Sequence, residues 1–173
     1  MAQQLARDHP HRVDRLVLAC TYACNHITRR ERIEARVSSC LLAALGPGRL
    51  ARQVLPGRGG PALSAAEAAG LQRMLGANTR RQALAAHRAL MDFDSRAWLN
   101  QIYAPTLVVC GYADTAAPAW HSYLLAIGIP NAELARIKGA GHALLWTHTP
   151  QFAGTIDSWL SRPTQAQGLS VSS

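Results

Sequence analysis

The fold class of this chain follows from one stretch of sequence, Thr106-Leu107-Val108-Val109-Cys110-Gly111-Tyr112-Ala113-Asp114. Its first five residues form a short apolar run, which is typical of a buried strand. Pro118 then begins a helix-like segment. Parallel α/β sheets present catalytic groups at the carboxyl ends of their strands. The stretch therefore predicts an α/β fold, and it makes the carboxylate of Asp114 a candidate catalytic group.

A histidine occupies the equivalent place after the next strand-like segment. The short strand-like segment at 132–137 is followed by Gly139-Ala140-Gly141-His142, and a further helix is expected from Thr149. Because one helix and one strand separate Asp114 from His142, we predict that they are the catalytic acid and base. The alternative interpretation is a helix N-terminal acid and a turn histidine.

The rest of the chain organises around these strands. Strands separated by helices imply a parallel sheet, and we expect strands at 13–20, 106–110 and 132–137. The interval 25–95 has no strand-like run, so we interpret it as a helical lid over the strand ends. The expected domains are a partial α/β core over 1–24 and 96–162, the lid over 25–95 and a disordered tail over 163–173.

Periodicity and caps divide the expected lid into helices at 28–45, 49–55, 64–75 and 80–91, with a flexible loop at 56–61. Ser64 and Glu67 have the spacing of a capping box. The first helix carries one apolar stripe, the pattern of a helix that buries one face. Its members are Ile33, Val37, Cys40, Leu41 and Leu45.

Length and composition are those of one globular domain. The chain has 173 residues, of which 49% are hydrophobic, and this is enough for a core. Its apolar runs are far shorter than the roughly 20 residues that span a bilayer. An amphipathic stretch follows Met1, in place of a signal-sequence pattern. We therefore expect a cytoplasmic protein without a membrane partner.

The net charge is +8, and arginine carries almost all of the positive charge. This balance makes a basic nucleic-acid binder, acting through the helices at 28–36 and 80–88, one candidate function. The arginines are dispersed, however, and acids are interleaved with them in the segment 29–34. That arrangement favours a solvated helix face, so nucleic acid is the least favoured partner.

The four cysteines are at 20, 24, 40 and 110. Cys20 and Cys110 belong to apolar runs and are expected to be buried. Cys20, Cys24 and His26 suggest a metal site, but no second half with ligand spacing accompanies them. We predict no metal, no cofactor and no disulfide.

Three segments resemble parts of an α/β-hydrolase and occur in the family's order. The segment 2–18 resembles the helix after the nucleophile and the next strand, 102–118 resembles the acid-bearing strand and loop, and 139–142 resembles the loop of the catalytic histidine. Residues 1–162 are thus similar to the C-terminal part of a lid-bearing group, which includes 3-oxoadipate enol-lactonase-like esterases and lactonases.

The resemblance implies a Ser-His-Asp mechanism for hydrolysis of a carboxylic ester or lactone. Asp114 would orient and stabilise the imidazolium of His142, and His142 would act as general base and then as general acid. The chain order, with the acid before the histidine, agrees with the family. Trp98, Trp120 and Trp146 are candidate substrate-binding residues, with core packing as the alternative.

The chain has no Gly-x-Ser-x-Gly, the turn that carries the family's serine just before the helix with which this chain begins. We therefore expect a truncated hydrolase with an incomplete triad, Met1 as an internal start, and no activity of the chain alone. An N-terminal hydrolase fragment would then be its partner. The alternative is a non-catalytic remnant or interaction module that self-associates through strand 13–20.

Overall fold

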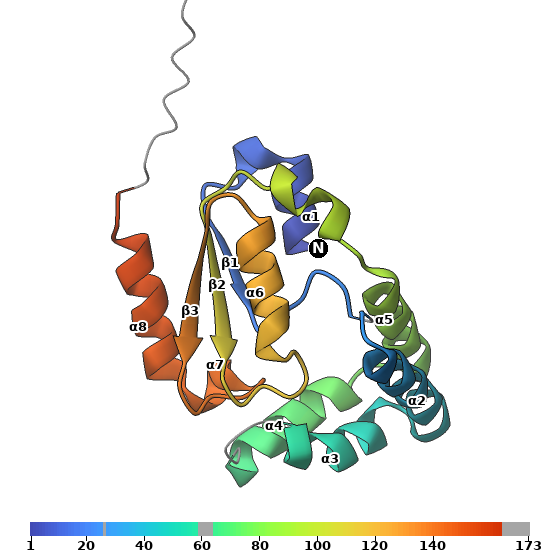
Figure 1. Ribbon diagram of the computed structural model, residues 1–173. Coiled ribbons are helices and arrows are strands. Elements are labelled where there is room, and N and C mark those ends of the chain that lie inside the picture. Colours follow the sequence, from blue (N-terminus) through green and yellow to red (C-terminus); the bar gives the residue numbers. More distant parts are fainter. Residues whose placement is uncertain (26, 59–63, 164–173) are drawn as a thin grey trace, which may run out of the picture.

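The centre of the fold is a sheet of three parallel strands in the order β1-β2-β3. A computed structural model describes residues 1–25, 27–58 and 64–163 (Figure 1). The strands are β1 (Leu16–Ala19), β2 (Thr106–Gly111) and β3 (Ala132–Ile137). Thr106 of β2 lies opposite Leu16 on one side and Ala132 on the other. The predicted α/β fold with three parallel strands is confirmed.

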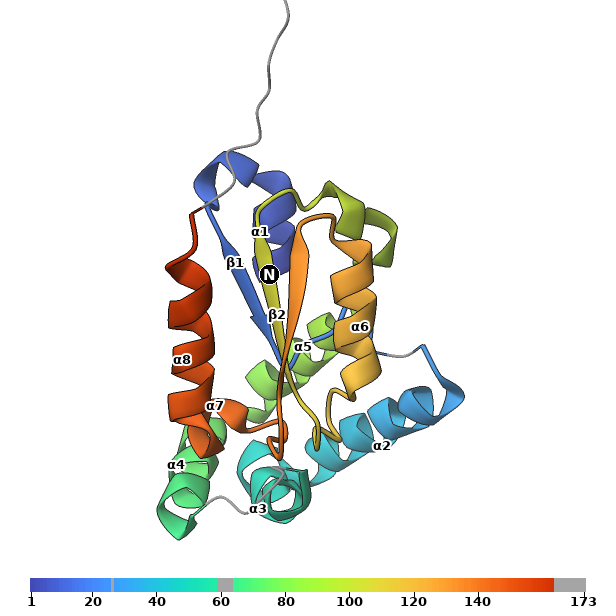
Figure 2. The same ribbon diagram turned by 60° about the vertical axis from the view of Figure 1, so that its left-hand side comes forward.

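Helices cover both faces of the sheet (Figures 1 and 2). The helices α1 (Ala2–Asp8) and α6 (Ala119–Gly128) lie on one face, and α8 (Thr149–Leu160) lies on the other. Val108 belongs to the apolar cluster on the α1 and α6 side, whereas Leu107 and Val109 belong to the cluster on the α8 side. Every residue of β2 is buried, which explains why the strand is an unbroken apolar run.

Two short elements were not predicted. The first expected strand begins only at Leu16, because a 3₁₀ helix, η1 (Pro10–Arg12), precedes it, and proline favours such a turn. The helix α7 (Leu144–Thr147) has four residues, too few to show a helical period. A second 3₁₀ helix, η2 (Arg96–Gln101), leads into β2.

Between β1 and η2 the chain forms a helical segment of α2 (Arg29–Leu45), α3 (Pro47–Arg58), α4 (Ala65–Gly76) and α5 (Arg80–Asp92). Three of these helices begin with a complete capping box, at Thr28, Ser64 and Thr79, and only the box at Ser64 was predicted. None of the described helices is long and apolar enough to cross a membrane.

The apolar stripe predicted on α2 is exposed, not buried. Ile33 and Val37 are 62% and 51% exposed, and Leu42, outside the stripe, is the buried residue of this helix. The reason is that α2 packs mainly on α5 and α3, so its other sides face solvent. The helix α3 also continues to Arg58, where a loop was expected from Pro56. The remainder of that loop, 59–61, and the expected tail from 164 onward lie outside the described residues.

One buried contact joins the helical segment to the core. Nε2 of His121, on α6, lies 3.0 Å from Oε1 of Glu31, on α2. The imidazole is almost completely buried, and it stacks on Trp120 with ring centroids 3.6 Å apart. The other oxygen of Glu31 accepts the backbone N–H of Thr28 at 2.9 Å. The carboxylate of Glu31 therefore bonds both to the start of α2 and to the imidazole of His121 on α6.

The buried imidazole predicts how stability depends on pH. Burial lowers the pKa of His121, and Glu31 opposes that shift only in part. The unfolded chain binds a proton at this histidine near about pH 6.5, whereas the lowered pKa means that the folded chain binds it only at a lower pH. The free energy of unfolding should therefore fall as the pH drops from about 7 to 5, and it should fall less steeply in His121→Gln. Urea unfolding at each pH measures the two slopes.

The control for loss of a histidine is His11→Gln, because His11 is exposed. If the free energy of unfolding changes with pH equally in wild type and in His121→Gln, the burial of this imidazole does not make stability depend on pH.

Candidate active site

The carboxylate of Asp114 is fixed in a turn just beyond β2. Its side chain has no exposed surface. Oδ1 accepts the backbone N–H groups of Ala116 at 2.8 Å and Ala117 at 2.7 Å. The other oxygen, Oδ2, is left to face the loop that follows β3. These backbone donors therefore orient the carboxylate independently of any contact with another side chain.

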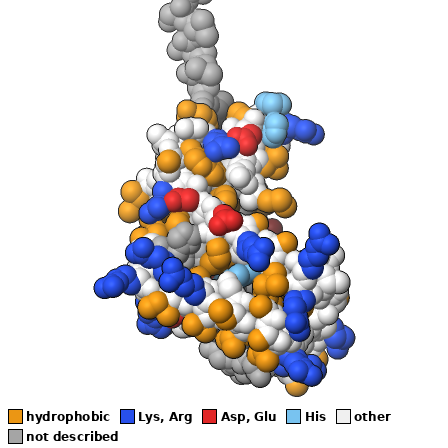
Figure 3. Space-filling view, turned by 90° about the vertical axis from the view of Figure 1, so that its right-hand side faces the viewer, with side chains coloured by type: hydrophobic (Ala, Val, Ile, Leu, Met, Phe, Trp, Pro, Cys, Tyr) orange, Lys and Arg blue, Asp and Glu red, His pale blue; other side chains and the backbone are white. Residues whose placement is uncertain are grey.

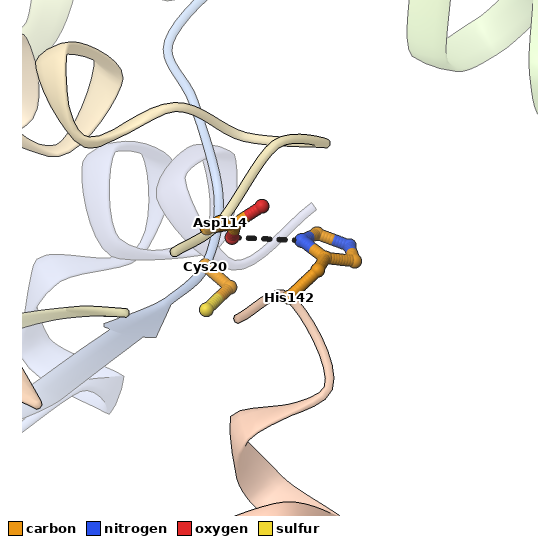
Figure 4. Close-up of side chains that lie close together, drawn as sticks. All are labelled: Cys20, Asp114 and His142. Carbon is orange, nitrogen blue, oxygen red and sulfur yellow. Dashed lines mark hydrogen bonds and ion pairs between the residues drawn. The ribbon is translucent and has the colours of Figure 1, made fainter. Parts of the chain in front are cut away.

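His142 lies in that neighbouring loop, and its ring meets the carboxylate (Figure 4). Nδ1 of His142 is 2.9 Å from Oδ2 of Asp114. The ring itself is 46% exposed, so the hydrogen bond joins a buried acid to an accessible base. The structure therefore brings together the two residues that the sequence predicts as catalytic.

Electrostatics gives this pair a defined protonation pattern. Burial alone would raise the pKa of Asp114, but the hydrogen bonds from His142 and the Ala117 amide outweigh it and hold that pKa below its ordinary value. The carboxylate is therefore ionised at neutral pH and can only accept hydrogen bonds. Neutral His142 must then carry its proton on Nδ1, which leaves Nε2 as the basic nitrogen.

The two loops approach so closely because residue 111 is a glycine. A Cβ at Gly111 would lie 2.3 Å from the carbonyl oxygen of Ala140. The backbone N–H of Ala113 donates to that same oxygen at 2.8 Å. The absence of a side chain at Gly111 thus lets the Asp114 loop bond directly to the His142 loop.

Cys20 is a third functional group at this edge. The sequence predicts it as a buried thiol, and it is 8% exposed. Its Sγ, an oxygen of Asp114 and a ring nitrogen of His142 all lie within 4.8 Å of one another. Burial, with a further contribution from Asp114, raises the pKa of Cys20 to about 12, so the thiol is protonated and a poor nucleophile at neutral pH.

Sequence reasoning did not connect Cys20 with the other two groups, although a signal was present. Cys20 follows β1 directly, as Asp114 and His142 follow β2 and β3. Because neighbouring parallel strands end at the same edge of a sheet, this pattern predicts that all three groups lie close together there. Cys20 also has a φ of 45°, a left-handed conformation that is uncommon for a residue with a side chain.

A cleft of about 720 Å³ opens beside the pair, lined by Asp114 and His142 on one side and by α2 and α5 on the other. Trp120 is part of this lining. Trp98 is not: it packs against the core beside Phe93 and under the guanidinium of Arg7. Trp146, on α7, is 45% exposed and also lies outside the lining. Only one of the three predicted tryptophans therefore reaches the cleft.

Positive charge is spread over the helical segment. Figure 3 shows Lys and Arg side chains scattered over the lower half of the face, where α2 to α5 lie, with apolar side chains between them. An acid pairs with one of these arginines within α2, where Arg30 lies 2.8 Å from Glu34. On this face the arginines do not form one continuous basic patch.

Comparison with known proteins shows the family to which the chain belongs. No family model matches the chain. The chain is 32% identical to a pimeloyl-[acyl-carrier protein] methyl ester esterase of Aromatoleum aromaticum, over 91% of its own length and 68% of that protein. It belongs to the α/β-hydrolase family.

Two further matches show a shared fold and a local sequence similarity. The fold of this α/β-hydrolase chain superimposes on the enol-lactonase of Burkholderia xenovorans LB400 with a TM-score of 0.79 and 23% identity, over 93% of the chain and 61% of the lactonase. A stretch of 78 residues is 44% identical to polyketide synthase ThaQ of Burkholderia thailandensis, covering 45% of the chain and 4% of the synthase. The chain thus spans less than two thirds of the lactonase and a small part of the synthase.

The close approach at residue 111 predicts a mutational effect. In Gly111→Ala the new methyl group overlaps backbone atoms, so the two loops must separate, at a cost of about 1–3 kcal/mol in the free energy of unfolding. Denaturant unfolding measures this loss. The matched control is Gly154→Ala in α8, where a Cβ meets nothing within 4 Å. That change should stabilise the helix by about 0.5–1 kcal/mol. Equal stability of Gly111→Ala and wild type would contradict the close packing of the loops.

Proposed function

We propose that this chain supplies the acid and the base of a carboxylic ester hydrolase. The observation that carries the proposal is the 2.9 Å hydrogen bond between the fully buried Asp114 and the half-exposed His142. In this mechanism Nε2 of His142 removes the proton of a serine hydroxyl as that hydroxyl attacks the ester carbonyl. Asp114 stabilises the resulting imidazolium, which then protonates the leaving alcohol.

The cleft supports an ester or lactone as the substrate class. The names of the methyl ester esterase and the enol-lactonase refer to an ester and a lactone. In both of these groups an acyl carbon is bonded to an alkoxy oxygen. Leu90, Met91 and Trp120 give the cleft wall an apolar part, suited to the acyl chain. In this proposal the helical segment α2 to α5 acts as the lid, since two of its helices, α2 and α5, form the cleft wall opposite the catalytic pair.

The nucleophile in this proposal comes from outside the 173 residues. Within the described ranges, the side chain of His142 makes its one hydrogen bond to Asp114, and no serine hydroxyl reaches it. Cys20 does not replace a serine, because its thiol is buried and protonated. We therefore infer that the chain alone does not turn over esters. A segment carrying Gly-x-Ser-x-Gly would complete the triad.

The outer edge of β1 is the place where such a segment would join. Among the described residues β1 pairs only with β2. The N–H groups of Leu16 and Cys20 point toward β2, where they donate to Pro105 and Val109. Alternation along a parallel strand then directs the N–H of Val17 to the opposite side. A further parallel strand would pair there and bring its own carboxyl end to the edge that holds His142.

Labelling with a fluorophosphonate tests the function. The chain alone should not react. Co-expression with an N-terminal α/β-hydrolase fragment that carries Gly-x-Ser-x-Gly should give labelling of that fragment and turnover of p-nitrophenyl acetate. Asp114→Asn in the chain should lower this turnover by about 10⁴-fold, as loss of the acid does in other triads. The control is His11→Ala, an exposed histidine. Labelling of the lone chain, or no gain on co-expression, would overturn the proposal.

Substitution of Val17 by proline tests separately whether the missing segment pairs with the outer edge of β1. Val17→Pro removes the outward N–H and leaves the β1–β2 hydrogen bonds of Leu16 and Cys20 in place. The variant should fold, as circular dichroism can show, but should lose complementation by the fragment. Val17→Thr retains the N–H and should complement like wild type. Full complementation by folded Val17→Pro would exclude pairing at this edge.

A further inference from the structure

Three different side chains that are able to bind a metal lie close together at the strand ends. Sγ of Cys20, a carboxylate oxygen of Asp114 and a ring nitrogen of His142 lie within 4.8 Å of one another (Figure 4). Within the described residues this is the single cluster of three or more potential ligands with such spacing. Each ligand comes from a different strand end, so the sheet register fixes their positions relative to one another.

The distances suit a small tetrahedral ion. Zinc binds nitrogen and oxygen at about 2.0–2.1 Å and thiolate sulfur at about 2.3 Å. Two such nitrogen and oxygen ligands at a tetrahedral angle lie about 3.3 Å apart, and Oδ2 of Asp114 and Nδ1 of His142 are already 2.9 Å apart. A sulfur ligand in the same geometry lies about 3.6 Å from each of them. Since the three ligand atoms already lie within 4.8 Å of one another, Cys20 has to move by about 1 Å to reach this spacing.

The surroundings also suit an ion. A set of one sulfur, one nitrogen and one oxygen favours Zn²⁺ or Co²⁺ over Mg²⁺ or Ca²⁺, which prefer oxygen alone. The amides of Ala116 and Ala117 hold the second oxygen of Asp114, as outer partners do in metal sites. The exposed ring of His142 offers a route in from the cleft.

We propose that Cys20, Asp114 and His142 form a three-ligand site for Zn²⁺, with a fourth position open to the cleft. On binding, the thiol of Cys20 forms the S–Zn bond and releases one proton to solvent. The ion takes the place of the hydrogen between Asp114 and His142. The imidazole proton passes from Nδ1 to Nε2, so Nε2 is no longer basic. Zinc and the catalytic use of His142 therefore exclude each other, while metal binding itself does not depend on the proposed function.

Cobalt provides a direct spectroscopic test on the full chain with reduced thiols. Wild type should bind one equivalent of Co²⁺ and show both a thiolate-to-cobalt charge-transfer band and the intense d–d bands of a tetrahedral ion. Added Zn²⁺ should remove these bands. Cys20→Ser should abolish the charge-transfer band and weaken Zn²⁺ binding by more than about 100-fold, the largest effect usual for an outer partner.

The other cysteines give matched controls. Cys24→Ser removes a buried thiol and Cys40→Ser an exposed one, and both variants should retain the band and the affinity. His142→Gln alters an exposed ring and tests the same site if Cys20→Ser does not fold. Its Zn²⁺ affinity should also fall more than about 100-fold. No charge-transfer band in wild type, its survival in folded Cys20→Ser, or its loss in Cys24→Ser would overturn the proposal.

Discussion

The buried carboxylate of Asp114 is the group around which the rest of the site is arranged. Two backbone amides hold one of its oxygens, and His142 holds the other. A buried ionised group is tolerated only when such partners replace water. The two amides belong to the same turn as Asp114, whereas His142 comes within reach because Gly111 lets the loops after β2 and β3 touch through their backbones. The chemistry of this edge thus depends on a contact between two loops as much as on two side chains.

The scaffold explains why functional groups gather at this edge. Helices cover both faces of the sheet, so only strand ends and edges remain for binding and reaction. All three strands are parallel, and each one ends in a polar or sulfur-bearing group. The helical segment then closes one side of the cleft, and the buried contact between Glu31 and His121 joins it to the core. The same contact couples the position of α2 to the protonation of a buried ring.

How much the sequence predicts depends on the physical origin of each feature. The strand at 106 is an unbroken apolar run, and the strand at 132 has apolar residues interrupted by Glu133 and Arg136. Both segments are short and lie between helix-like segments, so their positions and the placement of Asp114 and His142 follow from the sequence. The stripe through Ile33 and Val37 has the same helical period as a buried face, but its burial depends on neighbours that pattern alone does not reveal. Tryptophan packs equally well in a core and in a cleft wall, so the sequence does not show that Trp98 belongs to the core and Trp120 to the cleft. The closeness of Cys20 to Asp114 and His142 depends on the order and register of the strands, which are properties of the assembled sheet and not of any single segment.

The most direct test of the account is the tautomer of His142 in solution, read from a long-range ¹H–¹⁵N spectrum of the full chain above neutral pH. The buried, ionised Asp114 predicts that Nδ1 carries the proton and that Nε2 has the shift of an unprotonated nitrogen. In Asp114→Asn this preference should disappear, because an amide can donate as well as accept. A wild-type ring with its proton on Nε2, or a mixture that Asp114→Asn leaves unchanged, would contradict the hydrogen bond on which the site is built.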